Sequence, residues 1–197
     1  SAKEAISIWS AINGPVALKI VSPDILHKTE IGGVRLNLND PTEIEDAFND
    51  IIEAGTKHYP KANIEGVIVS EMISEGVETV LGVINDPIFG PAVMFGLGGV
   101  FVEVLGDVTF RLAPFDLSEA HRMIAEIKGI KMLFGTRGAA ASDIDAIADA
   151  LVKLSIFAST NSDKISSIDI NPFIVRPEGQ GAVGVDALII PHGVDVI

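Results

Sequence analysis

Apolar residues recur along the chain with two spacings, the three-to-four-residue spacing of a helix and the alternating or continuous spacing of a strand. Helical spacing predicts helices over 2–12, from Thr42 to a stop at Gly55, from Asp116 to a close at Gly129, and over 142–158. The other pattern predicts strands over 16–21, 34–38, 67–73, 79–84, 92–95, 100–104, 108–112, 165–175 and 182–190. Several strands follow one another directly, which favours mixed-sheet α+β lobes over a doubly wound parallel sheet.

Local signals add detail to two of these elements. Thr42 with Glu45 forms a capping-box pattern at the start of the second helix. In the strand 34–38, strict alternation predicts that Val34, Leu36 and Leu38 share one face.

Charge and composition exclude several function classes. The chain carries 14 Lys and Arg against 27 Asp and Glu, a net charge of −13, which argues against unassisted binding to nucleic acid or anionic membrane. It has no cysteine, hence no disulfide, no thiolate zinc site and no cysteine nucleophile. The longest uncharged stretch, between Asp86 and Glu103, is too short for a membrane span. The first residues do not form a signal peptide, and the absence of cysteine fits a reducing cytoplasm, which is the expected location.

Lys19 is the first candidate for chemistry, because an ammonium group in an apolar strand is unfavourable unless it is paired. Two interpretations stay open: Lys19 reaches water from a polar face of the strand, or it points into a cleft and neutralises a phosphate. Gly32 and Gly33 supply a nearby turn whose backbone N–H groups could approach the same anion. The P-loop pattern is absent.

His27 lies in a polar loop beside Lys28 and Thr29. It is either a solvated turn residue or, with its neighbours holding an anion, an imidazole that accepts a phosphoryl group.

Three oxygen-bearing side chains form the next candidate. If Ile168 and Ile170 face the core, Asp169 and Asn171 face the other way. Asp186, on the last strand, would lie beside them in a hairpin. Carboxylate and amide oxygens suit Mg²⁺ shared with nucleotide phosphates, and the alternative is a set of polar cross-strand contacts without metal.

A glycine-rich segment, residues 95–100, lies between apolar strands. It is read either as a hairpin turn or, with Glu103, Asp107 and Arg111 nearby, as part of a cleft wall.

Five stretches together resemble one family. They are PVALKIVSPDILHKTEIGGVRL (15–36), EMISEGVE (71–78), DPIFGPAVMFGLGGVFVEVLGDVTFRLAP (86–114), GTRG (135–138) and the segment 169–186. In this order they are similar to the ATP-grasp domain of NDP-forming acyl-CoA synthetases. The likeness is greatest to the β-subunit, or β-like domain, of ADP-forming acetyl-CoA synthetase, a relative of succinyl-CoA synthetase. The resemblance implies two α+β lobes, residues 1–68 and 69–197, with a nucleotide cleft between them.

The resemblance also implies residue roles. Lys19 matches the lysine that binds nucleotide phosphate, and His27 matches a histidine that relays phosphate on the nucleotide-binding subunit. Asn171 and Asp186 match the magnesium ligands. The remaining matches are the hinge that reads the adenine edge (Glu71, Met72, Ile73) and three cleft positions (Glu78, Glu103, Arg111).

The implied activity needs ATP or ADP, Mg²⁺ and a partner. Phosphate would pass from an acyl phosphate to the principal phosphohistidine on a CoA-binding α-subunit or domain, then to His27, then to ADP. A hetero-oligomer or a fused multidomain chain is therefore expected. The family's preceding helix and strand do not occur before Ser1, which suggests a truncated chain or a piece supplied by another chain.

Three alternatives stay open. The chain is a non-catalytic regulatory module of a protein acetyltransferase, a subunit of a succinyl-CoA-synthetase-like ligase, or a structural fragment without nucleotide binding. Neither the acyl substrate nor the choice between ADP and GDP is set by these residues.

Overall fold

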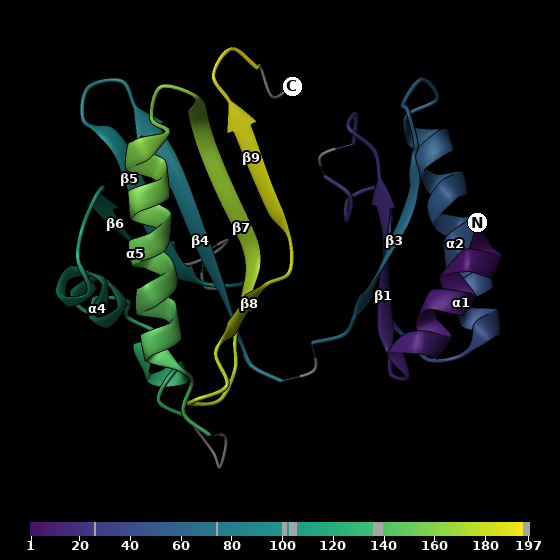
Figure 1. Cartoon of the computed structure of the whole chain (residues 1–197), viewed down its shortest axis with the longest axis horizontal. Helices are drawn as coiled ribbons and strands as arrows, with labels where there is room; N and C mark the ends of the chain where they lie inside the picture. Colours follow the sequence, from purple (N-terminus) through teal and green to yellow (C-terminus); the bar gives the residue numbers. More distant parts are fainter. Residues whose placement is uncertain (26, 74, 100–101, 103–105, 136–139, 195–197) are drawn as a thin grey trace. The chain divides into compact units, whose positions relative to one another are not determined.

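The chain divides into two compact units, Ser1–Ser74 and Glu75–Ile197, and each is described by itself. The computed structural model describes residues 1–25, 27–73, 75–99, 102, 106–135 and 140–194. Each unit has its own antiparallel sheet and its own hydrophobic core (Figure 1). The boundary expected between residues 68 and 69 falls inside strand β3 (Gly66–Glu71). All of β3 pairs with β1 (Val16–Val21), so the strand belongs wholly to the first unit.

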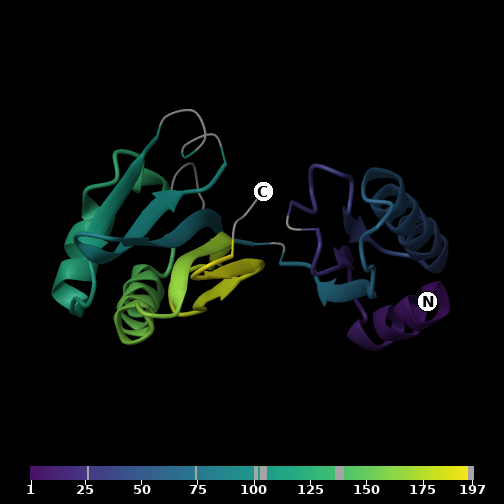
Figure 2. The same cartoon turned by 90° about the horizontal axis from the view of Figure 1, so that it is seen from above.

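The first unit is a three-stranded sheet with two helices on one face (Figure 2). Its elements in chain order are α1 (Ala2–Ile12), β1, β2 (Val34–Leu38), α2 (Pro41–His58) and β3, and the strand order is β2-β1-β3. Leu18 and Ile20 of β1 are fully buried against Ile44 and Ile51 of α2. This contact between a strand face and a helix face forms the core of the unit.

Helix α2 differs from its prediction at its start. Its N-cap is Asp40, not Thr42, because an Asp40 side-chain oxygen accepts from the backbone N–H groups of Thr42 and Glu43. The Glu43 carboxylate accepts from the Asn39 backbone N–H at 2.7 Å. The expected capping box with Glu45 is therefore wrong.

The end of α2 was also predicted too early. The helix continues through Gly55 to His58. A Cβ at Gly55 would lie 2.4 Å from Cδ1 of Ile20. The glycine thus permits close packing of α2 on β1 and does not stop the helix.

The alternation expected in β2 is broken at Asn37, which has a φ of 58°. This left-handed residue turns the chain, so Leu38 is buried (8% exposed) whereas Leu36 is 55% exposed. The register between β1 and β2 shifts at the same point.

The second unit is a six-stranded sheet with helices on one face (Figure 1). Its order is β6-β5-β4-β7-β8, and β9 also pairs with β7. The elements are β4 (Val77–Asp86), β5 (Gly90–Leu97), β6 (Val108–Leu112), α4 (Leu117–Ala125), the 3₁₀ turn η1 (Ile130–Met132), α5 (Ile144–Thr160), β7 (Ile165–Val175), β8 (Ala182–Gly184) and β9 (Ala187–Pro191). Apolar side chains of β4, β5 and β7 form the core with α4 and α5.

The strand predicted over 182–190 is interrupted. It divides into β8 and β9 at residues 185–186, opposite Asn171 and Pro172 of β7. Proline has no N–H to donate, so the ladder cannot run unbroken past Pro172. The break is where Asp186 lies, which makes it part of the candidate site.

Two helix ends and one strand complete the comparison with the sequence predictions. The helix begun at Asp116 ends at Ala125, before Gly129, and α5 starts at Ile144 after its N-cap Asp143. The predicted strand 100–104 lies mostly outside the described residues, and Val102, which is described, is helical. None of the helices in the described ranges has the length and apolar character needed to cross a bilayer.

Candidate functional site

Asn171 of β7 lies opposite Asp186, which is in the short connection between β8 and β9. The backbone N–H of Asn171 donates to the carbonyl oxygen of Asp186 at 3.1 Å, and that of Val185 donates to the Pro172 carbonyl at 3.0 Å. The hairpin contact predicted from the sequence is therefore confirmed. Fifteen positions of chain separate the two side chains, and the sheet makes them neighbours.

Asp169 belongs to the same part of the sheet. Its neighbours Ile168 and Ile170 pack into the core with the helices, while Asp169 and Asn171 are exposed, as the alternation predicted. Because Ile168 and Ile170 face the helices, the Asp169 carboxylate lies on the side of the sheet that α4 and α5 do not cover. Its partner on β4 is Gly82, which has no side chain.

The carboxylates of Asp169 and Asp186 lie close enough for their negative charges to interact. Partial burial raises the pKa of Asp169 above its ordinary value, and the nearby charge of Asp186 raises it further. Two carboxylates and a carboxamide are hard oxygen donors that fit Mg²⁺ or Ca²⁺. Among the described residues, no group of three or more His, Cys, Asp and Glu side chains is placed so that it could hold a metal ion. A cation here would need the Asn171 oxygen and oxygens from a substrate or water.

Asp169→Asn is expected to increase the free energy of unfolding at pH 7 in the absence of divalent cation. The pKa of Asp169 is higher in the folded than in the unfolded chain. The free energy of unfolding therefore falls as the pH rises from the ordinary pKa of the carboxyl to its raised folded-state pKa, because the folded chain resists ionisation. The gain should stay below about 1 kcal/mol, since Asp169 is exposed and its charge is screened by water. Urea unfolding at pH 7 and pH 3 measures it, with exposed Asp163→Asn as control. An equal gain at both pH values would contradict the assignment.

Lys19 occupies the middle strand of the first unit, where its Cα faces Val34 of β2 and Ile68 of β3. Leu18 and Ile20, on either side, point into the helix-covered core. Lys19 is therefore on the helix-free side of the sheet, half-buried, next to Ile68, which is 52% exposed. An ammonium group among apolar side chains on an open sheet face can meet a phosphate while the apolar neighbours contact a base.

His27 stands on the loop that follows β1. Its side chain is 62% exposed, and its Nδ1 lies 3.9 Å from a carboxylate oxygen of Glu30. An exposed imidazole is accessible for phosphoryl transfer, so this placement is compatible with the role that the resemblance implies.

Gly32 and Gly33 close this loop and do not offer their N–H groups to an anion. The Gly33 N–H donates to Lys28 O at 2.7 Å, and the Gly32 N–H donates to Thr29 O at 3.1 Å. A Cβ at Gly33 would lie 2.8 Å from both Lys28 O and Cγ2 of Ile20. The expectation that these amides cradle a phosphate is thus corrected: the glycines let the loop pack on β1.

The predicted hinge lies at the end of the first unit. Glu71 is the last residue of β3, and the Met72 N–H donates to Pro15 O at 3.0 Å. Met72 is thereby tied to the start of the strand that carries Lys19, and Ile73 follows it. In the second unit the carbonyl of Glu78 accepts from the Gly98 N–H at 2.8 Å, so Glu78 lies against the start of the glycine-rich segment.

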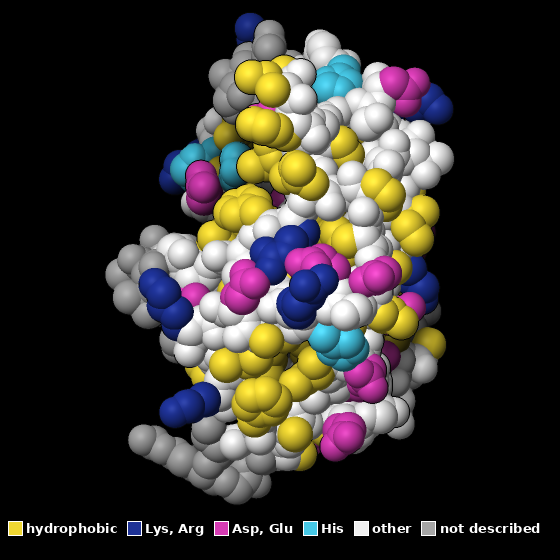
Figure 3. Space-filling view, turned by 90° about the vertical axis from the view of Figure 1, so that its left-hand side faces the viewer, with side chains coloured by type: hydrophobic (Ala, Val, Ile, Leu, Met, Phe, Trp, Pro, Cys, Tyr) yellow, Lys and Arg dark blue, Asp and Glu magenta, His cyan; other side chains and the backbone are white. Residues whose placement is uncertain are grey.

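Arg111 lies apart from the oxygen cluster. Its strand partner Val93 is in the core under the helices, so Arg111 projects toward α4, where its guanidinium contacts Glu119 and Glu126 at 2.5 Å each. These hydrogen bonds, that with Glu126 foremost, raise its pKa above the ordinary value. Figure 3 shows charged side chains in a band on this face, with hydrophobic side chains on both sides. The placement favours a structural role at the sheet–helix junction.

Two predicted elements of the site cannot be located. Glu103 and residues 136–138 of the GTRG stretch lie outside the described residues.

Comparison of the sequence with models of protein families identifies the family of this chain. Residues 1–190 match the model of a family described as ATP-grasp domain. This chain belongs to the ATP-grasp family. The fold described above, mixed α/β with antiparallel sheets, is accordingly an ATP-grasp fold.

Two curated relatives show which ATP-grasp proteins it is similar to. It is 45% identical over 190 residues to the β subunit of acetate–CoA ligase [ADP-forming] II of Pyrococcus furiosus, spanning 96% of this chain and 80% of that subunit. It is 46% identical to acetate–CoA ligase [ADP-forming] I of Archaeoglobus fulgidus, spanning 91% of this chain but only 26% of that longer chain. This ATP-grasp chain thus corresponds to the β part of such ligases.

A solved relative gives the same result in three dimensions. The dinucleotide-forming acetyl-coenzyme A synthetase 1 of Ca. Korarchaeum cryptofilum, in complex with coenzyme A, Ca-AMPCP and HgCl⁺, matches with a TM-score of 0.92 and 45% identity over 98% of this chain and 82% of that chain. The same protein with Mg-AMPPCP, its phosphohistidine segment pointing towards the nucleotide binding site, matches with a TM-score of 0.81 and 42% identity over 98% and 83%.

Proposed function

We propose that this ATP-grasp chain is the nucleotide-binding part of an ADP-forming acyl-CoA synthetase and transfers phosphate between a phosphohistidine and ADP. The observation that carries the proposal is the backbone pairing that brings Asn171 to Asp186, beside Asp169, on the helix-free side of the sheet. A solved relative of 45% identity, the acetyl-coenzyme A synthetase 1 of Ca. Korarchaeum cryptofilum, is in complex with Ca-AMPCP, which supports nucleotide binding by this chain.

The oxygen cluster of the second unit would hold the metal. Asn171 and Asp186 supply an amide and a carboxylate oxygen, and Asp169 adds negative charge that a divalent cation would offset. When bound, Mg²⁺ neutralises charge on the transferring phosphoryl group. Crowding of two carboxylates without a cation is unfavourable, which supports a cation-binding role for this group.

Lys19 would bind the nucleotide phosphates from the first unit. Its ammonium is a point charge suited to a phosphate oxygen, and its place on an open sheet face leaves Ile68 and Leu36 for apolar contact with the base. Phosphoryl transfer depends chiefly on positioning and charge neutralisation, which are the tasks assigned to Lys19 and the oxygen cluster.

His27 would carry the phosphate before it reaches ADP. The imidazole nitrogen attacks the phosphorus of the partner's phosphohistidine, and one N–P bond forms as the other breaks. A terminal phosphate oxygen of ADP then attacks this phosphorus, forming a P–O bond and releasing neutral imidazole. A relay is needed when the acyl and nucleotide sites lie in different subunits or domains.

The partner would be a CoA-binding subunit or domain. One relative is named a β subunit, and another is a single chain of which this sequence covers about a quarter. Both hetero-oligomeric and fused arrangements thus occur among relatives, and either would supply the principal phosphohistidine.

Calorimetric titration of the complete protein with ADP tests the proposal. Saturable one-to-one binding that weakens at least about tenfold when Mg²⁺ is removed is expected, because the metal carries much of the phosphate charge. Absence of nucleotide binding would show a structural subunit and contradict the proposal. Binding without transfer of label from [γ-³²P]ATP to a histidine would identify the regulatory-module alternative instead.

A further inference from the structure

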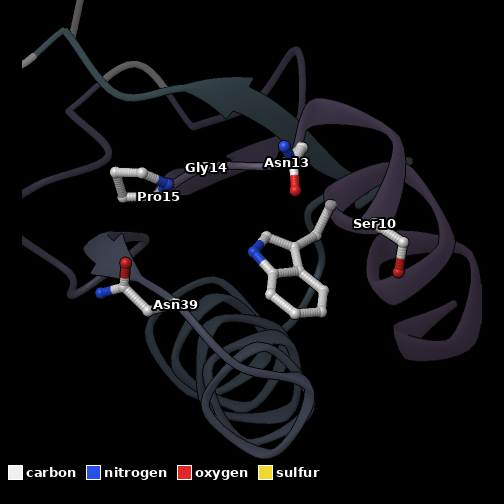
Figure 4. A pocket seen from close by; sticks show the side chains of 6 residues that line it. Ser10, Asn13, Gly14, Pro15 and Asn39 are labelled. Carbon is white, nitrogen blue, oxygen red and sulfur yellow. The ribbon is translucent and has the colours of Figure 1, made fainter.

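A pocket in the first unit lies outside every residue assigned to the nucleotide site. It encloses about 420 Å³ where α1 ends, β1 begins and β2 leads into α2. Its lining residues are Trp9, Ser10, Asn13, Gly14, Pro15 and Asn39. Figure 4 shows Asn13, Pro15 and Asn39 arranged around the hollow, with Ser10 farther along α1. The volume is in the range of small-molecule sites.

One of the lining residues, Trp9, carries a hydrogen-bond donor without an acceptor among the described residues. Trp9 Nε1 is buried and has no acceptor in the described part of the chain. An indole N–H can only donate, and withdrawing it from water without an acceptor is unfavourable. Such a group in a native protein calls for an explanation, and a ligand that supplies the acceptor is one.

The opposite wall offers an acceptor. The Asn39 side-chain N–H donates to Asn37 O at 2.6 Å, which fixes the carboxamide and leaves its oxygen without a donor among the described residues. The backbone N–H of Asn39 is occupied by the Glu43 carboxylate. Asn13 has a left-handed backbone with a φ of 57°, and its backbone N–H donates to Trp9 O. Its side-chain carboxamide makes no hydrogen bond within the described ranges.

The charges around the pocket exclude an anion. None of the described residues that line it is charged, and the carboxylates of Asp40 and Glu43 lie at the start of α2, within four positions of Asn39. An anionic ligand would be repelled there, whereas a neutral group that accepts from Trp9 and donates to Asn39 is complementary.

We propose that this pocket binds a neutral secondary amide, whose carbonyl accepts from Trp9 Nε1 and whose N–H donates to the Asn39 side-chain oxygen. The indole and Pro15 supply the apolar wall that such a site needs. Pro15 O also accepts from the Met72 N–H, so an occupant lies next to the segment that ends the first unit. A free amide and the main chain of a bound peptide share this chemistry.

Trp9 is the one tryptophan of this chain, and its indole cross-peak in a ¹H–¹⁵N correlation spectrum of the complete protein is assigned by its loss in Trp9→Phe. Titration with N-methylacetamide is expected to shift this peak downfield and to saturate. N,N-dimethylacetamide, which has no N–H, should bind about fivefold more weakly. Acetate at matched ionic strength should give no saturable shift. N-acetylglycine N-methylamide distinguishes the sources: tighter binding than N-methylacetamide identifies a peptide main chain, and equal binding a free amide.

Variants separate the proposed contacts. Asn39→Ala should remove the difference between the two acetamides, and exposed Asn63→Ala should leave both titrations unchanged. With Trp9→Phe, the Gly14 backbone peak should report weaker binding of N-methylacetamide. Non-saturable shifts, or equal responses to all solutes, would overturn the proposal. The proposal would also be overturned if Asn13→Gly moved the indole peak before any amide is added. That result would mean that the Asn13 side chain is the acceptor for Trp9 Nε1 in solution.

Discussion

Lys19→Met is expected to weaken the binding of Mg-ADP by about 10- to 100-fold, the loss typical of removing a hydrogen bond to a charged group. Methionine keeps the length and the apolar stem of lysine, so the packing of β1 between β2 and β3 should be retained. The effect follows from the position of Lys19 on the helix-free face of the sheet, between Val34 of β2 and Ile68 of β3.

Calorimetry on the complete protein measures this loss. Lys61→Met is the matched control, because Lys61 is exposed in the connection between α2 and β3 of the same unit. Lys19→Arg should recover part of the affinity, since the positive charge is kept while the planar guanidinium changes the geometry. An unchanged dissociation constant for Lys19→Met would remove Lys19 from the proposed site.

His27→Asn is expected to reduce ATP formation from acyl-CoA, ADP and phosphate by about 10³-fold or more, because it removes the imidazole nitrogen to which the phosphoryl group would be transferred. Asparagine preserves polarity and approximate size. The dissociation constant of Mg-ADP should change by less than about threefold, since an exposed imidazole adds little to nucleotide affinity.

The separation of these two effects is the discriminating measurement. Activity is assayed with the CoA-binding partner present, and base-stable, acid-labile ³²P on this chain is followed after incubation with [γ-³²P]ATP. His58→Asn is the control, because His58 is an exposed histidine at the end of α2. Retention of label in His27→Asn, or full activity, would assign the relay to another residue.

Elements with strong local patterns were predictable from the sequence. The ends of α1, β1, β2, β6 and β7 agree with the apolar spacing and the turn residues that bound it. Such signals act over a few residues and need no knowledge of the rest of the fold.

Predictions failed where a distant contact decides the local structure. Gly55 was expected to end a helix, yet it serves the approach of α2 to Ile20. The strand 182–190 was expected to be continuous, yet Pro172 of a neighbouring strand interrupts it. In both cases the deciding atom comes from another element, which spacing along the chain does not reveal.

For the site, the sequence by itself determined the residue types and the family, because five motifs in one order are specific to it. Only the tertiary structure decided that Asn171 pairs with Asp186 and that Arg111 points toward α4. It also decided that the N–H groups of Gly32 and Gly33 donate to carbonyl oxygens of their own loop. Sequence specifies which groups are present. Strand pairing and packing specify which face of a sheet each one reaches and whether its hydrogen bonds are already made.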